Sequence, residues 1–178
     1  MKKKTLFLEF LETLIFVVLV VLPIRYFIFE PFIIRGESMY PNFYNGDYII
    51  AEKLSYFIRD PERYEVVVFK APPFKTTYYI KRIIGLPGEK VEIKNGKIKI
   101  YNKENPNGFY LDENYQKIDL DKNENLVFEL KENEYFVLGD NRPASFDSRK
   151  WGAVLRKDII GRAIIKVFPP KFIYAEKK

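Results

Sequence analysis

Apolar residues run almost without interruption from Leu11 to Phe29, and beyond this stretch they alternate with polar residues. The core of the stretch, Thr13 to Ile24, carries no charge and is bounded by Glu12 and Arg25. A helix of this length can cross about 30 Å of hydrocarbon while the two flanking charged side chains reach the interfaces. We therefore expect residues 11–29 to form a transmembrane anchor.

Two other interpretations of this stretch are weaker. A cleavable signal peptide should end in small residues, whereas this core runs into RYFIFEPF. A buried amphipathic helix should present a polar face to solvent, and this core is apolar on every side. Three lysines at positions 2–4 favour a cytoplasmic N-terminus, here residues 1–10. Residues 30–178 would then lie on the extracytoplasmic face of the plasma membrane.

After Pro31 the pattern predicts mainly β structure. Apolar residues rich in Ile, Val, Tyr and Phe form short runs that end at turn residues such as YNGD, IRDPER and GLPG. Asn95-Gly96 between KVEI and KIKIY predicts a two-residue β-hairpin, because both residues tolerate the positive φ of a type I′ turn. The strands that we expect lie at 31–36, 47–54, 64–70, 76–84, 90–93, 97–101, 126–130, 134–140 and 161–169.

The stretch from Asn102 to Asn125 interrupts the strand pattern, because it is polar and rich in Asn, Asp, Glu and Lys. We interpret it as an exposed insertion that belongs to a small subdomain at about residues 94–131. The segment NRPASFDSRKWG, residues 141–152, is predicted to be a loop.

The charge balance changes this picture little. The 178 residues include 30 basic and 24 acidic side chains, a formal net charge of +6. Such a balance suits an anionic membrane surface or a nucleic acid. Apart from MKKK at the start and EKK at the end, however, the basic residues are dispersed, and nucleic-acid recognition usually needs a basic stripe. We expect no nucleic-acid partner.

The absence of histidine and cysteine narrows the possible chemistry. Ser38 in GESMYPNF is a candidate nucleophile, but a serine hydroxyl needs a base within hydrogen-bond reach. Without histidine there is no Ser-His-Asp triad, and without cysteine there is no thiol catalysis and no thiolate metal site. The base must be a lysine, a carboxylate or a terminal amine. We expect neither a metal nor a cofactor.

Lys81 is a candidate for that base. In YYIKRIIG, strand alternation places it on one face with Tyr79 and Ile83. Burial among apolar neighbours would lower its pKa and leave a neutral fraction able to accept a proton. A surface lysine at a strand edge is the commoner case, and spacing within one strand does not decide between the two.

A polar loop, GDNRPASFDSR, lies between residues 139 and 149. The hydroxyls of Ser145 and Ser148 can hydrogen-bond to a nearby amine, and Asp147 can pair with Arg149. An ordinary Asx-rich surface turn has the same composition, which on its own favours that interpretation.

The ordered set of motifs resembles bacterial type I signal peptidase, the membrane-bound serine endopeptidase that removes signal peptides from exported preproteins. The resemblance runs from about Leu14 to Pro169 and depends on EPFIIRGESMYPN, GDYIIAEKL, YYIKRIIGLPGE, YFVLGDNRPASFDSR and WG followed by IIGRA. It implies a coiled antiparallel β-sheet catalytic domain behind one N-terminal transmembrane helix. Its partners would be signal peptides and the lipid bilayer.

The resemblance also assigns roles to individual residues. Ser38 would be the nucleophile and Lys81 the general base of a Ser/Lys dyad. Ser145 would orient the lysine, and Asp147 with Arg149 would brace the loop.

Further roles follow from the same resemblance. Met39 would help to bury the lysine, and Phe32, Ile34, Tyr79 and Ile80 would line two shallow pockets for small residues at positions −1 and −3 of the signal peptide. The backbone N–H of Ser38 would contribute to the oxyanion hole, because Gly36 stands where some members have a serine hydroxyl. Asn42 replaces the usual threonine that follows SMxP.

Two other classes share part of the pattern. Self-cleaving LexA-type repressors use a serine and a lysine on a similar fold, but they are soluble and carry a DNA-binding domain. An inert, anchored β module that binds extended peptides would have little reason to keep Ser38, Lys81 and Ser145 together.

Overall fold

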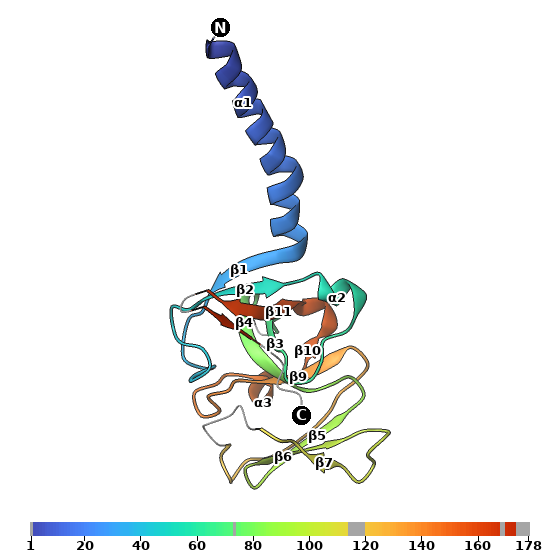
Figure 1. Ribbon diagram of the computed structural model, residues 1–178. Coiled ribbons are helices and arrows are strands. Elements are labelled where there is room, and N and C mark those ends of the chain that lie inside the picture. The colour runs from blue at the N-terminus through green and yellow to red at the C-terminus, as the bar shows by residue number, and fades with distance from the viewer. Residues whose placement is uncertain (1, 73, 114–119, 168–169, 174–178) are drawn as a thin grey trace.

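The computed structural model describes residues 2–72, 74–113, 120–167 and 170–173. A long helix leads from the N-terminus into a β-rich domain (Figure 1). It comprises α1 (Lys2–Phe16) and two π-helical segments, Val17–Val21 and Ile24–Ile28. The helix ends where strand β1 begins, at Phe29.

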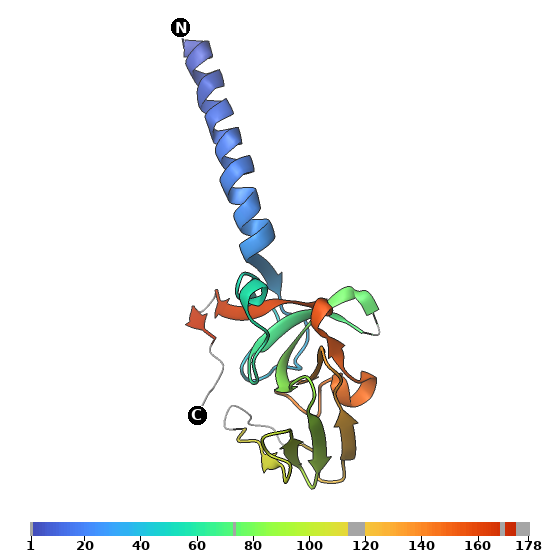
Figure 2. The same cartoon turned by 90° about the vertical axis from the view of Figure 1, so that its right-hand side faces the viewer.

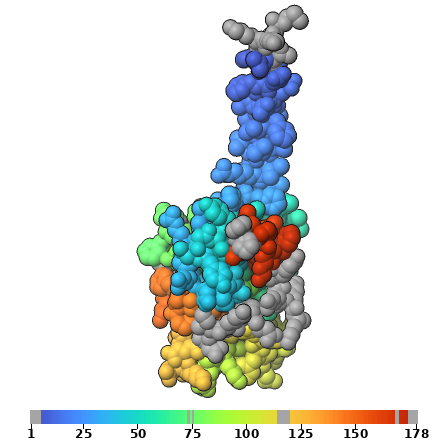
Figure 3. Space-filling model, turned by 60° about the vertical axis from the view of Figure 1, so that its left-hand side comes forward, coloured from blue at the N-terminus to red at the C-terminus, as the bar shows by residue number. Residues whose placement is uncertain are grey.

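The helix is long and apolar enough to cross a membrane. Its apolar part, Leu6–Ile28, has 23 residues, which at 1.5 Å per residue gives a length of about 35 Å. Nearly all of its side chains are exposed, and in the space-filling view the helix stands clear of the domain (Figure 3). An apolar surface of this kind is stable in lipid and unfavourable in water. The predicted anchor, residues 11–29, lies within this helix except for its last residue.

The main sheet has eight antiparallel strands in the order β1-β2-β11-β3-β4-β9-β10, with β12 paired to β11. The order places three strands between β1 and β4. Nevertheless the rings of Phe32 on β1 and Tyr78 on β4 lie 5.4 Å apart, because the sheet coils. The fold is therefore mainly β with a coiled antiparallel sheet, as predicted. Its strands are β1 (Phe29–Ile33), β2 (Tyr48–Glu52), β3 (Val66–Ala71), β4 (Phe74–Gly85), β9 (Glu134–Leu138), β10 (Val154–Leu155), β11 (Ile159–Lys166) and β12 (Lys171–Phe172).

A second sheet is inserted between β4 and β9. Its strands are β5 (Lys90–Lys94), β6 (Lys97–Tyr101), β7 (Phe109–Tyr110) and β8 (Asn125–Glu129), in the order β7-β6-β5-β8. It lies at the end of the domain opposite to the helix (Figure 2). The predicted hairpin is present: Lys94 pairs with Lys97, and Asn95 and Gly96 have φ of 52° and 74°.

The core follows the apolar runs of the sequence. The continuous run Val66–Phe69 is buried on both faces of β3, because Val66 and Val68 pack in one hydrophobic core while Val67 and Phe69 pack in another. In the second sheet, Val91, Ile93, Ile98 and Ile100 pack on one face, and their polar neighbours in sequence are more exposed. This alternation gives the inserted sheet its own hydrophobic core.

Three local predictions were wrong. The second predicted strand ends at Glu52, because residues 55–58 form the short helix α2 (Ser55–Ile58). The predicted loop 141–152 contains helix α3 (Ser148–Trp151), whose N-cap Asp147 accepts a hydrogen bond from the Arg149 N–H. The stretch 102–125 is not simply exposed, since Leu120 is buried against the second core. Residues 114–119 of that stretch lie outside the described residues.

Candidate active site

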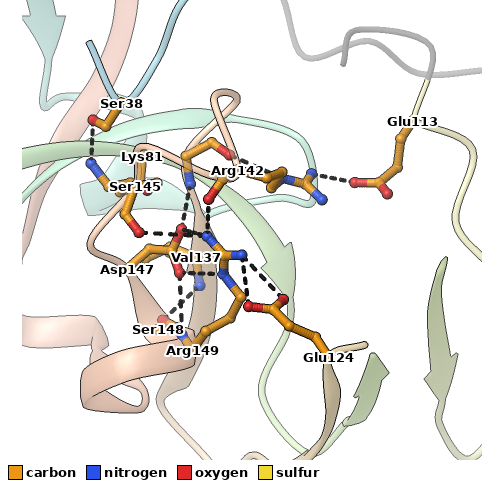
Figure 4. A network of polar contacts seen from close by, with 11 residues as sticks. Ser38, Lys81, Glu113, Glu124, Val137, Arg142, Ser145, Asp147, Ser148 and Arg149 are labelled. Carbon is orange, nitrogen blue, oxygen red and sulfur yellow. Dashed lines mark hydrogen bonds and ion pairs between the residues drawn. The ribbon is translucent and has the colours of Figure 1, made fainter. Parts of the chain in front are cut away.

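Ser38 and Lys81 meet at one end of a groove, although 43 residues separate them in the chain. Ser38 lies in the loop between β1 and β2, and Lys81 lies on β4. The Lys81 Nζ and Ser38 Oγ atoms are 2.7 Å apart in a hydrogen bond (Figure 4). This is the distance that a general base needs to remove the hydroxyl proton.

Lys81 is buried, with 4% of its surface exposed. Burial disfavours the ammonium form and lowers the pKa of Lys81 to about 8, against the opposing effect of the negative charges on Asp147 and Asp140. The Ile80 carbonyl accepts a second hydrogen bond from Nζ at 2.9 Å. Among the described residues, no carboxylate forms an ion pair with this amine. A substantial fraction of the Lys81 side chain is therefore neutral near pH 8.

Arg82, the next residue along β4, shows the opposite arrangement. Arg82 is equally buried, but its guanidinium donates two hydrogen bonds to the Asp140 carboxylate, at 2.9 and 2.7 Å. Asn42 Nδ2 donates a third bond to the same carboxylate at 2.8 Å. Asn42, which departs from the expected threonine, thus has a specific partner 98 residues away. Sequence reasoning missed Asp140, which stands beside Gly139 in the GDNR motif.

Replacing Arg82 by methionine should destabilise the fold. The buried Asp140 carboxylate would lose both hydrogen bonds from the guanidinium and keep the one from the Asn42 amide. Loss of one partner from a buried ion pair typically costs about 3–5 kcal/mol. Urea unfolding measures this directly. The matched control is Asp60→Asn, which removes a surface ion pair to Arg156 in which Asp60 is 81% exposed. That pair is worth less than about 1 kcal/mol. Equal losses in the two variants would contradict the expectation.

Polar contacts from residues 139–149, which we call the catalytic loop, fix the backbone around Ser38. The N–H of Asn141 donates to the Ser38 carbonyl at 3.0 Å, and its side-chain amide donates to the Glu37 carbonyl at 3.1 Å. On the other side, Gly36 has a φ of +91° and donates its N–H to Asn45 Oδ1 at 3.0 Å. A glycine suits this backbone conformation.

Ser145 lies close to the backbone of Ser38 but makes no hydrogen bond to the Lys81 amine. Its Oγ is buried and has no hydrogen-bond partner among the described residues. A Cβ on Gly139 would lie only 2.3 Å from this oxygen and 2.4 Å from the Ser38 carbonyl oxygen, so only glycine fits there. The orienting role expected of Ser145 therefore stays a prediction, since no hydrogen bond joins it to Lys81.

Asp147 and Arg149 form the expected pair. Two hydrogen bonds join the guanidinium to the carboxylate, at 2.8 and 2.9 Å. The carboxylate also accepts the Gly139 N–H at 3.1 Å. Ser148, the other hydroxyl considered above, is buried and accepts a hydrogen bond from the Val137 N–H at 3.0 Å, so it holds the loop to β9. Met39 is 1% exposed and packs in the core that also contains Ile34.

A groove of about 370 Å³ leads to the dyad. The edges of β1 and β4 form its walls, and the catalytic loop contributes Ala144 and Phe146. Among the described residues, β1 pairs only with β2, and β4 pairs with β9 only from Arg82 onward. Backbone edges thus remain open along the groove. All four side chains predicted to line substrate pockets do line it: Phe32, Ile34, Tyr79 and Ile80.

Comparison with known proteins places the chain in a family. The model of the family described as signal peptidase, peptidase S26, matches residues 7–168. The chain belongs to this family. Probable signal peptidase I-2 of Synechocystis sp. is 40% identical over 168 residues, which cover 91% of this chain and 73% of that protein. Signal peptidase I P of Bacillus subtilis subsp. natto is 35% identical over 174 residues, covering 94% and 92%.

A solved signal peptidase I structure from Enterococcus faecalis is 34% identical, with a TM-score of 0.49 over 58% of this chain and 97% of that one. Membership of the peptidase S26 family identifies the chain as a serine endopeptidase. Within the part of the chain that the structure describes, no three Asp, Glu, His or Cys side chains cluster so as to hold a metal ion.

Proposed function

We propose that this protein is a membrane-bound signal peptidase that cleaves preproteins with the dyad Ser38 and Lys81. The 2.7 Å contact between the serine hydroxyl and a buried lysine amine carries the proposal. Two further features support it, the lowered pKa of Lys81 and the open strand edges beside the dyad.

The reaction begins when the neutral Lys81 amine accepts the Ser38 proton. The serine oxygen attacks the scissile carbonyl carbon, and the carbonyl oxygen becomes an oxyanion that the Ser38 N–H stabilises. Collapse of this intermediate breaks the C–N bond while the Lys81 ammonium protonates the leaving amine. The neutral lysine then takes a proton from water, whose oxygen attacks the acyl-enzyme. The proton returns to Ser38 as the signal peptide is released.

Substrate would bind as an extended strand between β1 and β4. The open backbone edges offer hydrogen bonds to the peptide main chain, and alternate side chains of the peptide would point into the groove. Phe32 and Ile80 line the groove together with Ser38 and Lys81, and we expect their bulk to favour small side chains at positions −1 and −3.

The apolar N-terminal helix supports membrane attachment. With the N-terminus in the cytoplasm, Leu6–Ile28 would cross the plasma membrane and the domain would lie on the extracytoplasmic face. Phe32 of the groove is only four residues beyond Ile28, and at about 3.3 Å per strand residue the groove begins within about 13 Å of the span. A cleavage site that follows the apolar core of a signal peptide would emerge at this level.

The decisive experiment is incubation of the detergent-solubilised protein with a preprotein, followed by sequencing of the new N-terminus. The expected result is one cleavage after a small residue at position −1. Replacing an alanine there by phenylalanine should lower kcat/KM at least about tenfold, if the part of the groove beside Ser38 takes only small side chains as proposed. Alanine to serine at the same position is the matched control and should be tolerated. Cleavage of both substrates at equal rates would contradict the pocket assignment.

A further inference from the structure

The inserted sheet supplies none of the residues that line the groove, yet two of its carboxylates reach the catalytic loop. Glu113 follows β7, and Glu124 precedes β8. Both belong to the polar stretch 102–125, where the sequence gives no sign of a catalytic contribution. Each of them pairs with an arginine of the loop (Figure 4).

The first pair joins Glu113 to Arg142. The Arg142 side chain is 1% exposed, and its Nε donates to the Gly139 carbonyl at 3.0 Å. Its terminal nitrogen pairs with the Glu113 carboxylate. The guanidinium therefore connects the start of the catalytic loop to the inserted sheet.

The second pair joins Glu124 to Arg149, whose side chain is 4% exposed. One terminal nitrogen lies 3.2 Å from both Glu124 carboxylate oxygens, while the other side of the guanidinium binds Asp147. Arg149 thus connects the end of the catalytic loop to the same sheet. Buried guanidinium groups of this kind require carboxylate partners, because an unpaired buried charge is strongly unfavourable.

Movement of the catalytic loop would displace the groups that surround Ser38 and Lys81. Asn141 holds the Ser38 and Glu37 carbonyls, and Ser145 packs against Gly139 beside Ser38. Ala144 and Phe146 line the same groove as Lys81. The position of the loop therefore controls both where Ser38 lies and how well water is excluded from Lys81.

We propose that Glu113 and Glu124 are positioning residues, through which the inserted sheet holds the catalytic loop over the dyad. This inference rests on the proposed signal peptidase function. In this proposal the polar insertion takes part in catalysis by holding the catalytic loop, and not by contacting the substrate.

The test uses the full-length protein in detergent and the variants Glu113→Gln and Glu124→Gln, which keep the side-chain shape and remove the charge. We expect kcat for preprotein cleavage to fall about 10-fold to 100-fold, because small misplacements of reacting groups cost this much. KM should change less than kcat, since neither glutamate lines the groove and the loop contributes only Ala144 and Phe146 to it. The matched control is Glu104→Gln, an exposed glutamate of the same insertion with no side-chain partner among the described residues. It should behave as wild type.

The pH profile of kcat/KM separates bracing from a simple charge effect. The charged groups around the amine are Asp140 and Asp147 of the catalytic loop and Arg82 on its own strand, which pairs with Asp140. Removing a distant negative charge from an intact loop would lower the pKa of Lys81 further. A loosened loop admits water and raises that pKa towards its ordinary value of 10.5. The proposal requires the upward shift.

The remaining outcomes are equally informative. If wild type fails to cleave any preprotein, the proposed function itself is wrong. If wild type cleaves and both variants match Glu104→Gln in kcat and in pH profile, only the positioning role is overturned. Thermal unfolding identifies folded variants, and either glutamine variant alone is sufficient for the test. If neither is folded at the assay temperature, the two glutamates are general stabilising residues and the proposal is overturned as well.

Discussion

Replacing Ser38 or Lys81 by alanine is expected to lower kcat/KM for a preprotein by at least about 10⁴-fold. The serine variant lacks the attacking oxygen, and the lysine variant lacks the group that removes its proton. Because the two atoms lie 2.7 Å apart and act in the same step, the double variant should be no less active than either single variant. Gel analysis of preprotein cleavage over a long incubation measures the loss.

Loss of activity counts only if the variants fold, and Lys81→Met provides that control. Lowering of the Lys81 pKa from 10.5 to about 8 means that the folded state binds fewer protons than the unfolded state between these two values. Below pH 8 the charged form destabilises the folded protein by up to about 3 kcal/mol. Lys81→Met should therefore be inactive yet unfold at a higher temperature than wild type at pH 7. More than about 1% residual activity in a folded lysine variant would contradict the base assignment.

The resemblance to signal peptidases predicted that Ser38 and Lys81 act together, and the two side chains do meet, whereas strand periodicity alone did not predict the contact. Strand alternation predicts that Lys81 and Arg82 point to opposite faces of the sheet, but in the structure both side chains are buried, at 4% exposed. The two residues differ in the groups to which they donate hydrogen bonds. Arg82 has the Asp140 carboxylate, while the hydrogen bonds that Lys81 donates go to a hydroxyl and a carbonyl. A single sequence gives the spacing of residues, but pairing across strands depends on the coiled sheet.

The contacts of the inserted sheet illustrate the same limit of sequence reasoning. A polar stretch rich in Asn, Asp, Glu and Lys is typically solvated, and only the tertiary fold brings Glu113 and Glu124 to arginines 29 and 25 residues away. Asn42 is similar, since its partner Asp140 is 98 residues distant. By contrast, the hairpin at Asn95-Gly96 could be predicted because a turn of this type is determined by local backbone preferences.

The second large effect expected is on the pH dependence of cleavage. If neutral Lys81 is the base, kcat/KM should rise tenfold per pH unit below a pKa of about 8 and level off above it. Activity at pH 6 should then be about a hundredfold below the plateau. The direction follows from the chemistry, because the ammonium that predominates at low pH has no lone pair to accept the Ser38 proton. Initial rates with a preprotein below KM, measured from pH 5 to pH 10, give the profile.

The cause of the lowered pKa determines what else should follow. Burial is its main cause, and the charges of Asp147 and Asp140 act in the opposite direction. Salt screens exposed charges far more than it changes burial, so the inflection should move little between about 0.05 and 0.5 M salt. A bound peptide excludes more water from the groove, which disfavours the charged amine further. The pKa seen in the pH profile of kcat, which reports the enzyme–substrate complex, should therefore be equal to or lower than the pKa seen in the profile of kcat/KM. A flat profile, or an inflection near 10.5, would mean that a solvated lysine or another group is the base.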